Sequence, residues 1–215
     1  MNTPTTTQDA LTTDELNALV AQFRSLRPTP CRNKALILAM ADAGLRLAEA
    51  LALELRDLRT DAGEITHIDI RKGKGARPRR VGTTPRLQIA LLRWLEVRRG
   101  LAIPGPILFC SISGGRSGGL APGQPLEPGR ALSPRYAQQL VQREARRADI
   151  PRRVTPHTLR HTFATRLLRS CGNLETVRKA MGHRSITTTS AYYSHLVQDD
   201  VDQAVAGLGL EDGKE

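Results

Sequence analysis

Aromatic residues and cysteines are scarce in this chain of 215 residues. It holds only three tyrosines, three phenylalanines and one tryptophan. The three cysteines are an odd number, and none forms a Cys-x-x-Cys pair. This excludes a disulfide framework and a zinc site built on cysteine pairs, and it predicts reduced thiols in a cytosolic protein.

Long hydrophobic runs are also missing. No apolar run approaches the length needed to span a membrane, and the first ten residues lack the basic and apolar regions of a signal peptide. The chain has no Gly-x-x-x-x-Gly-Lys-[Ser/Thr] loop for a nucleotide and no acidic cluster with the spacing of metal ligands. We therefore expect a soluble, cytoplasmic protein with no membrane partner, no cofactor and no metal.

Positive charge, by contrast, is abundant and unevenly placed. The formal net charge is +11, and the segments 71–99 and 143–184 hold most of the lysines and arginines, whereas acids dominate after residue 185. Such basic blocks indicate a polyanion partner, of which nucleic acid is the common one, although solvated arginines on every face would explain the total alone. The residues of these blocks that we expect to bind DNA are Arg71, Lys72, Arg77, Arg79, Arg80, Arg152, Arg153 and Arg184.

Helical patterns fill most of the chain. Thr12 and Glu15 have capping-box spacing, while Pro28 and Pro30 are expected to end that first helix. Further helices are expected around 33–44, 46–55 and 87–99, with Gly100 as a C-terminal cap, and then from Pro134 and from Pro156. Residues 196–208 form a last amphipathic pattern.

Only a few segments have the pattern of strands. Residues 64–71 alternate, with Thr66, Ile68 and Ile70 on one face, and 79–83 offers the return strand of a hairpin. Residues 107–112 could add a short strand, and the glycine- and proline-rich segment 114–129 reads as a long loop. The prediction is a mostly α domain with a small antiparallel β-sheet (α+β), over residues 11–208. Residues 1–10 are expected to be a disordered lead-in and 209–215 a tail.

Two short motifs place cations where a phosphate could bind. In "HTLR", His157 and Arg160 lie three apart on a helix, and His157 falls in the first turn, where backbone N–H groups favour an anion. In "GLRLAEALAL", Arg46 precedes Glu49 by three residues, and a guanidinium positioned by a carboxylate suits phosphate oxygens. Taken alone, "HTLR" is better explained as a solvated pair on a basic helix, and the Arg46–Glu49 spacing is a weak signal that a surface ion pair also explains.

A glycine-spaced basic segment and a pair of tyrosines complete the candidates. Lys74 stands in "RKGKGARPRR", where an ammonium could protonate a departing alkoxide or simply contact phosphate. Tyr192 and Tyr193 are adjacent, and Tyr192 follows His183 by nine residues. Two neighbouring phenols are hard to bury with both hydroxyls bonded, and a tyrosine near cations is a candidate nucleophile. Burial of both rings in the core remains the alternative.

Taken together, these motifs resemble the catalytic domain of the tyrosine recombinases, the phage integrase family. The resemblance rests on "GLRLAEALAL", "KGKGARPR", "TPHTLRHTFATRLL" and "MGHRSITTTSAYYSH", in that order, and extends from about Leu11 to about Leu208. It implies the tyrosine recombinase catalytic-domain fold. It also implies a site-specific recombinase or integrase that cuts and rejoins DNA without metal or ATP.

The resemblance assigns a role to each matching residue. Tyr192 is the nucleophile that forms a 3′-phosphotyrosyl bond, whereas Tyr193 does not match that position and is expected to be a packing or supporting residue. Arg46, Arg160 and His183 bind the non-bridging phosphate oxygens. Lys74 protonates the leaving 5′-oxygen, and His157 exchanges a proton with the tyrosine. Glu49 orients the cluster.

The chain departs from most of the family because no separate N-terminal core-binding domain precedes these motifs. It is similar in size to the small fimbrial-switch-type recombinases. The expected partner is double-stranded DNA, bound by a homotetramer on paired sites, with the helix at 196–208 exchanged between protomers or folded back. An accessory DNA-bending protein or a partner recombinase could assist, and the protein would be nucleoid-associated.

Three other functions fit part of the sequence. A type IB topoisomerase would use similar chemistry to relax DNA, and a non-catalytic DNA-binding regulator could keep the fold. A metal hydrolase could use His157 and His161, but "HTLRH" lacks the glutamate of a zincin and a third ligand, which favours a structural His161.

Overall fold

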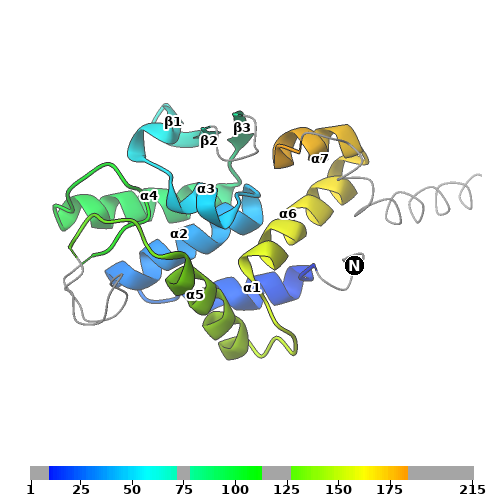
Figure 1. Cartoon of the computed structure of the whole chain (residues 1–215), viewed down its shortest axis with the longest axis horizontal. Helices are drawn as coiled ribbons and strands as arrows, with labels where there is room; N and C mark the ends of the chain where they lie inside the picture. The colour runs from blue at the N-terminus through cyan, green and yellow to red at the C-terminus, as the bar shows by residue number, and fades with distance from the viewer. Residues whose placement is uncertain (1–9, 72–77, 113–126, 184–215) are drawn as a thin grey trace, which may run out of the picture.

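The computed structural model describes residues 10–71, 78–112 and 127–183. Short helices and one small sheet follow each other along these ranges (Figure 1). The elements in chain order are α1 (Thr13–Ala21), α2 (Pro28–Asp42), α3 (Leu47–Leu51), the 3-10 turn η2 (Leu55–Asp57), β1 (Leu58–Asp61), β2 (Glu64–Ile70), β3 (Arg79–Gly82), α4 (Pro85–Gly100), α5 (Pro134–Arg147), α6 (Pro156–Cys171) and α7 (Leu174–Met181). The predicted mostly α fold with a small antiparallel sheet is confirmed.

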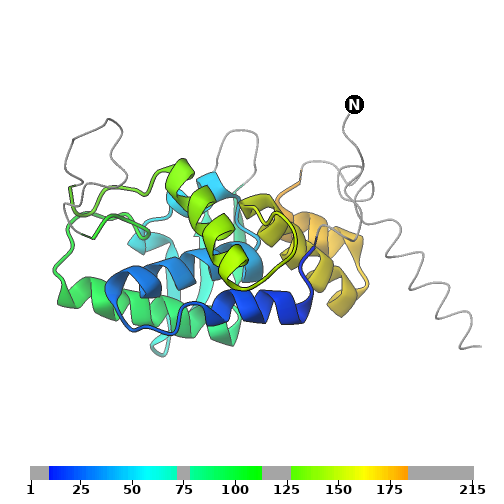
Figure 2. The ribbon, with the colours of Figure 1, turned by 90° about the horizontal axis from the view of Figure 1, so that it is seen from below.

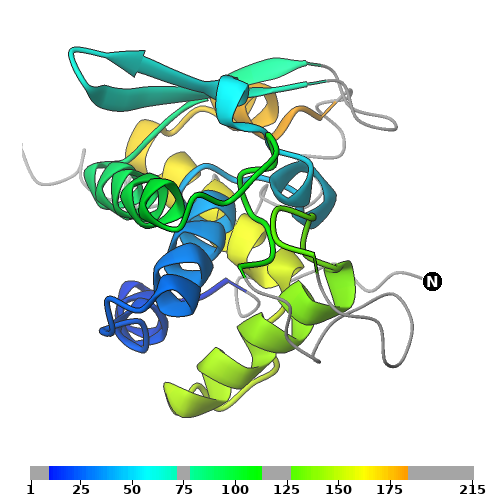
Figure 3. The same ribbon diagram turned by 90° about the vertical axis from the view of Figure 1, so that its left-hand side faces the viewer.

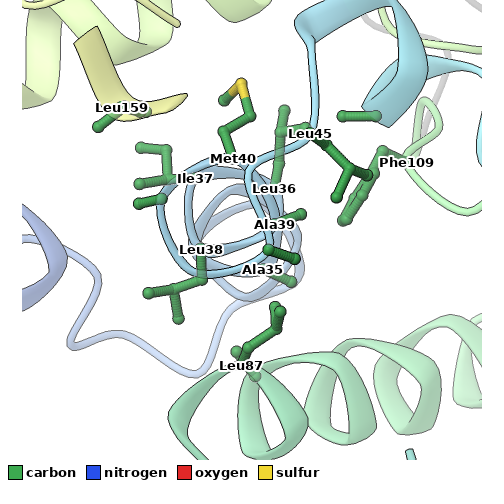
Figure 4. Packing of buried hydrophobic residues seen from close by; sticks show 14 of the residues in the cluster. Ala35, Leu36, Ile37, Leu38, Ala39, Met40, Leu45, Leu87, Phe109 and Leu159 are labelled. Atoms are coloured by element: carbon green, nitrogen blue, oxygen red, sulfur yellow. The ribbon is translucent and has the colours of Figure 1, made fainter. Parts of the chain in front are cut away.

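Helix α2 is the centre of the hydrophobic core. Every residue from Ala35 to Asp42 is buried, as expected for a helix that is apolar on all sides. Figure 4 looks along α2 and shows Leu87 of α4, Leu159 of α6 and Phe109 on three different sides of it. This packing fixes α4 and α6 relative to the end of α2, where Arg46 follows.

The sheet is antiparallel, with the order β1-β2-β3, and lies along one edge of the helical body (Figure 3). Ile68 pairs with Leu58 on one side and with Val81 on the other. Ile65, Ile68 and Ile70 are buried, and β2 packs on α4. The expected inward face of β2 is thus confirmed for Ile68 and Ile70, whereas Thr66 is only half-buried.

Local capping signals place most helix starts correctly. Thr12 and Glu15 form the expected capping box of α1, and Ser133 and Thr155 cap α5 and α6 ahead of a proline. The prediction that Pro28 ends the first helix is wrong. Helix α1 already ends at Ala21, and Pro28 begins α2. Gly100 is also not the cap of α4: it is the last helical residue, and Ala102, with φ 48°, makes the turn.

The strand expected at 107–112 is absent from this part of the structure. Ile107 and Cys110 form only isolated bridges, to Glu54 and Ala131. The structure adds β1, which the sequence did not indicate because its residues are mostly exposed and do not alternate. Most of the predicted loop 114–129 and the whole helix at 196–208 lie outside the described residues.

Helices α6 and α7 pack together at one end of the molecule, as Figures 1 and 2 show from two sides. Helix α7 also contacts β3. In the part of the chain that the structure describes, no helix is both long and apolar enough to cross a membrane.

Candidate active site

Arg46 is presented by a sharp turn between α2 and α3. Gly44, with φ +64°, reverses the chain after α2, and Arg46 is the residue before the first turn of α3. Glu49, one turn further on, accepts the backbone N–H of Arg46 at 2.8 Å and the Arg46 guanidinium at 2.9 Å. The pairing expected from their spacing is therefore present.

The Glu49 carboxylate is held in its charged form. Burial of this carboxyl raises its pKa, but hydrogen bonds from Arg79 and from the Arg46 backbone outweigh that and lower the pKa to about 2. Both of its oxygens bond to Arg79 and to Arg46, and the Arg160 guanidinium lies 3.7 Å away. Glu49 is thus an anionic anchor shared by three arginines.

Arg160 joins three segments of the chain. It lies on the second turn of α6, is 5% exposed, and donates to the carbonyl oxygens of Gly44 and Met181. Its Nη2 also lies 3.5 Å from Nε2 of His183. These contacts bring the turn before α3 and the end of α7 to one side of α6.

His183 follows α7 directly. Gly182, with φ +64°, ends the helix and turns the chain so that the imidazole faces Arg160. Burial and the positive charges of Arg160 and neighbouring arginines lower the pKa of His183 to about 4. The ring is therefore neutral at physiological pH.

These side chains line one cleft, with a volume of about 530 Å³. Arg46, His157, Arg160 and His183 all contribute to it, so the structure brings together four of the six residues predicted to be catalytic. His157 is exposed in the first turn of α6, as expected. Lys74 and Tyr192 lie outside the described residues.

The cleft is also lined by residues that were not predicted from the sequence. Gln138 and Gln142 of α5 face it, and their i,i+4 spacing is the signal that could have placed them on one helical face. Arg153, predicted to bind DNA, is exposed at this cleft. Among described residues its side chain has no ion pair, which leaves its charge available.

The other predicted DNA contacts are mostly engaged in ion pairs. Arg71 pairs with Glu54 and Asp57, Arg80 with Asp69, and Arg152 with Glu15. Arg79 differs from the expected surface contact, because its side chain is only 7% exposed and points inward to Glu49. Lys72, Arg77 and Arg184 lie outside the described residues.

A metal centre on His157 and His161 has no further ligands in the described ranges. Both histidines line the cleft, but His161 is only 4% exposed within α6, whereas His157 is exposed. Within these ranges no three His, Cys, Asp or Glu side chains gather as a possible ligand set.

Comparison with known proteins agrees with this geometry. The family model described as "Phage integrase family" matches residues 9–199. Tyrosine recombinase XerC of Vibrio parahaemolyticus serotype O3:K6 is 34% identical over 193 residues, which cover 87% of this chain and 56% of that protein. The chain thus spans about half the length of the curated relatives it matches.

Solved structures have the same fold. The XerH site-specific recombinase, bound to palindromic difH substrate in a post-cleavage complex, superposes with a TM-score of 0.72 at 27% identity, covering 95% of this chain and 53% of that one. The catalytic domain of bacteriophage HP1 integrase matches with a TM-score of 0.56 at 19% identity, covering 96% and 98%. The latter supports the fold alone.

Proposed function

Because this chain belongs to the phage integrase family, we propose that it is a site-specific DNA strand transferase that acts through a covalent link to Tyr192. The observation that carries the proposal is the convergence of Arg46, Arg160 and His183 on one cleft. The two guanidiniums supply positive charge and a planar donor geometry suited to the non-bridging oxygens of a phosphodiester, and the imidazole lies beside them.

The proposed step exchanges one phosphoester bond for another. The Tyr192 oxygen attacks the scissile phosphorus, the bond from phosphorus to the 5′-oxygen breaks, and a 3′-phosphotyrosyl bond forms. Lys74 gives its proton to the departing 5′-oxygen, and His157 takes the proton of the tyrosine hydroxyl. A phenol with a pKa of about 10 is mostly protonated at neutral pH, so a base and a positive field both help.

The fixed charges of the cleft do most of the catalytic work in this proposal. Charge accumulates on the phosphate oxygens in the transition state, and donors that are already positioned stabilise it without reorganisation. Arg160 is held by two carbonyls and Arg46 by Glu49, so neither has to move. Since the phosphotyrosyl bond conserves the energy of the phosphodiester, rejoining a 5′-hydroxyl reverses the step and requires no ATP.

The proposed partner is double-stranded DNA, and the proposed active form is a homotetramer on paired sites, with a DNA-bending protein or a second recombinase as possible assistants. The XerH relative is bound to its difH substrate, which supports DNA as the partner here. A cytoplasmic, nucleoid-associated location follows from that partner.

The decisive test is capture of the covalent intermediate. A candidate site is first selected by binding from a random-sequence duplex library, and a nick beside the cleavage position then traps the reaction. On a denaturing gel, wild type and Tyr193→Phe should give a protein–DNA adduct, and Tyr192→Phe should give none.

An adduct that survives loss of Tyr192 contradicts the nucleophile assignment. No adduct on a site that wild type binds supports a regulator, and relaxation of supercoiled DNA without recombinant product supports a topoisomerase.

A further inference from the structure

Arg79 is an arginine of the basic hairpin that does not face solvent. It begins β3, and its side chain is 7% exposed. It donates two parallel hydrogen bonds to Glu49, from Nη1 at 2.9 Å and from Nη2 at 2.8 Å, and its Nε donates to the Ala180 carbonyl at 2.8 Å. The neighbouring Arg80, by contrast, is exposed and pairs with Asp69 on the outer side of the sheet.

We infer that Arg79 is a positioning residue of the phosphate-binding cleft, which fixes the Glu49 carboxylate and the end of α7 while not contacting DNA itself. The inference rests on the proposed function of this cleft. Arg79 was predicted from the sequence to contact DNA, and the inference assigns it a structural role inside the protein instead.

The first part of this role concerns charge. Glu49 is the carboxylate closest to the phosphate-binding arginines, and its charge alone would offset the attraction that Arg46 and Arg160 offer to an incoming phosphate. The bidentate bond from Arg79 compensates that charge from the side away from the cleft; Arg79 does not line the cleft. Glu49 can then orient Arg46 while both cleft-facing guanidiniums keep their full positive charge.

The second part concerns the end of α7. The last carbonyls of a helix have no partner within it, and here two arginines supply donors: Arg79 bonds Ala180, and Arg160 bonds Met181. Gly182 follows, and a Cβ built there would lie 2.9 Å from Nη1 of Arg79. Arg79 thus packs directly under the residue that turns the chain toward His183.

One side chain therefore ties strand β3, helix α3 and the end of α7 together. The segment that precedes β3 in the chain contains Lys74, and the chain after α7 contains His183 and Tyr192. Loss of Arg79 should move these groups relative to the phosphate, so it should affect the rate of the bond exchange more than the affinity for DNA.

The test compares Arg79→Gln and Arg79→Lys with Arg86→Lys. Arg86 is the matched control, because it makes a similar bidentate bond to the buried Asp42 but lies outside the cleft. Adduct formation on the nicked duplex is measured in single turnover at several DNA concentrations, which separates the maximal rate from the half-saturating concentration. Thermal unfolding of each variant reports how much stability it loses.

We expect Arg79→Gln to lower the maximal rate by about 100-fold, because misplacing reacting groups by about 1 Å has an effect of that size. The half-saturating DNA concentration should change much less. Arg79→Lys keeps the charge and should recover part of that loss. Arg86→Lys should lower the melting temperature but leave the maximal rate of the folded protein within about twofold, since separate sites act independently.

The pH profile supplies a readout that a merely structural role would not change. The charged groups facing Glu49 are Arg46 from α3, Arg79 from β3 and Arg160 from α6. Without Arg79, burial should raise the pKa of Glu49, so the rate of Arg79→Gln relative to wild type should fall further as the pH is lowered. Arg86→Lys should keep the wild-type profile.

An unchanged maximal rate and pH profile in Arg79→Gln would overturn the inference. It would also be overturned if only the half-saturating DNA concentration rose, because Arg79 would then be a phosphate contact. If wild type itself forms no adduct, the proposed function fails, and NMR titration of the DNA-free protein decides the inference separately. The Glu49 carboxyl and His183 ring should both titrate at higher pH in Arg79→Gln than in wild type, and identical titrations would overturn it.

Discussion

At the scale of single residues, the cleft combines several arginines with a buried carboxylate, an unusual balance of charge for the proposed phosphate site. Three arginines surround one carboxylate, and the neighbouring His183 has its pKa lowered to about 4 by burial and by the arginines. A neutral imidazole adds a hydrogen-bonding group without adding a further positive charge beside the arginines. When a phosphate enters, its negative charge should raise the pKa of His183 again.

The lowered pKa of His183 predicts a pH dependence of stability. Its ordinary value is 6.5, so between pH 6.5 and about 4 the unfolded chain binds a proton that the folded protein does not. The free energy of unfolding should therefore decrease as the pH falls through this window. Urea denaturation of His183→Gln at about pH 7 and about pH 5 should show a smaller decrease than wild type.

The control is His67→Gln, which removes an exposed histidine from β2. It should follow the wild-type pH dependence. An equal decrease in wild type and His183→Gln would mean that the ring is not held neutral in the folded protein.

At the scale of elements, the turn between α2 and α3 links the core to the cleft. Gly44 adopts φ +64°, its carbonyl accepts a hydrogen bond from Arg160, and a Cβ built there would lie 2.3 Å from the Phe163 ring. Helix α6 therefore packs against backbone at this point, and only glycine allows both the conformation and the approach.

Gly44→Ala should consequently cost more than a left-handed backbone alone. Gly63→Ala is the matched comparison, because Gly63 has φ +86° with no atom within 4 Å of the added Cβ. We expect about 1 kcal/mol of destabilisation for Gly63→Ala and about 3 kcal/mol for Gly44→Ala, measured by urea denaturation. The double variant Gly44→Ala/Phe163→Ala should lose less than the sum of its parts, and equal costs for the two glycines would contradict the close packing.

The same comparison of near and distant contacts explains what the sequence could predict. Helix starts at Thr12, Ser133 and Thr155 were predictable because a cap and its partner lie three residues apart. The inward turn of Arg79 was not, because Glu49 lies 30 residues away and Ala180 lies 101 away. Strand β1 was not predictable for a different reason: its partner β2 is near in the chain, but pairing with β2, and not an alternating pattern of its own, makes it a strand.

For the candidate site, too, local features could be predicted from the sequence and contacts between distant segments could not. The identities of Arg46, His157, Arg160 and His183 could be predicted from motif order, because each motif carries its residue at a fixed local spacing. Their convergence depends on the packing of α6 on α2 and of α7 on α6, and it had to be seen. The catalytic roles of all six residues remain predictions, and Lys74 and Tyr192 lie outside the described residues.

At the scale of the whole molecule, the excess of positive charge is partly compensated internally. Arg71, Arg80 and Arg152 all form ion pairs with carboxylates, whereas Arg153 is exposed at the cleft with no such pair among the described residues. The net charge alone therefore overstates the number of phosphates that the protein can neutralise. Arg153 is the arginine in this set whose charge is most available to DNA.

This difference predicts how salt should affect DNA binding. Each phosphate contact releases counterions, so the logarithm of the association constant should fall linearly with the logarithm of salt concentration, with a slope of about −0.9 per contact. Arg153→Gln should reduce that slope by about one contact, measured by fluorescence anisotropy on one duplex over a range of salt. Arg93→Gln is the control, since Arg93 is equally a surface arginine but pairs with Glu96 on α4, away from the cleft.

An unchanged slope in Arg153→Gln would show that the backbone of the DNA does not pass over this side of the cleft. An equal reduction in both variants would show that the slope reports total charge rather than contacts at the cleft.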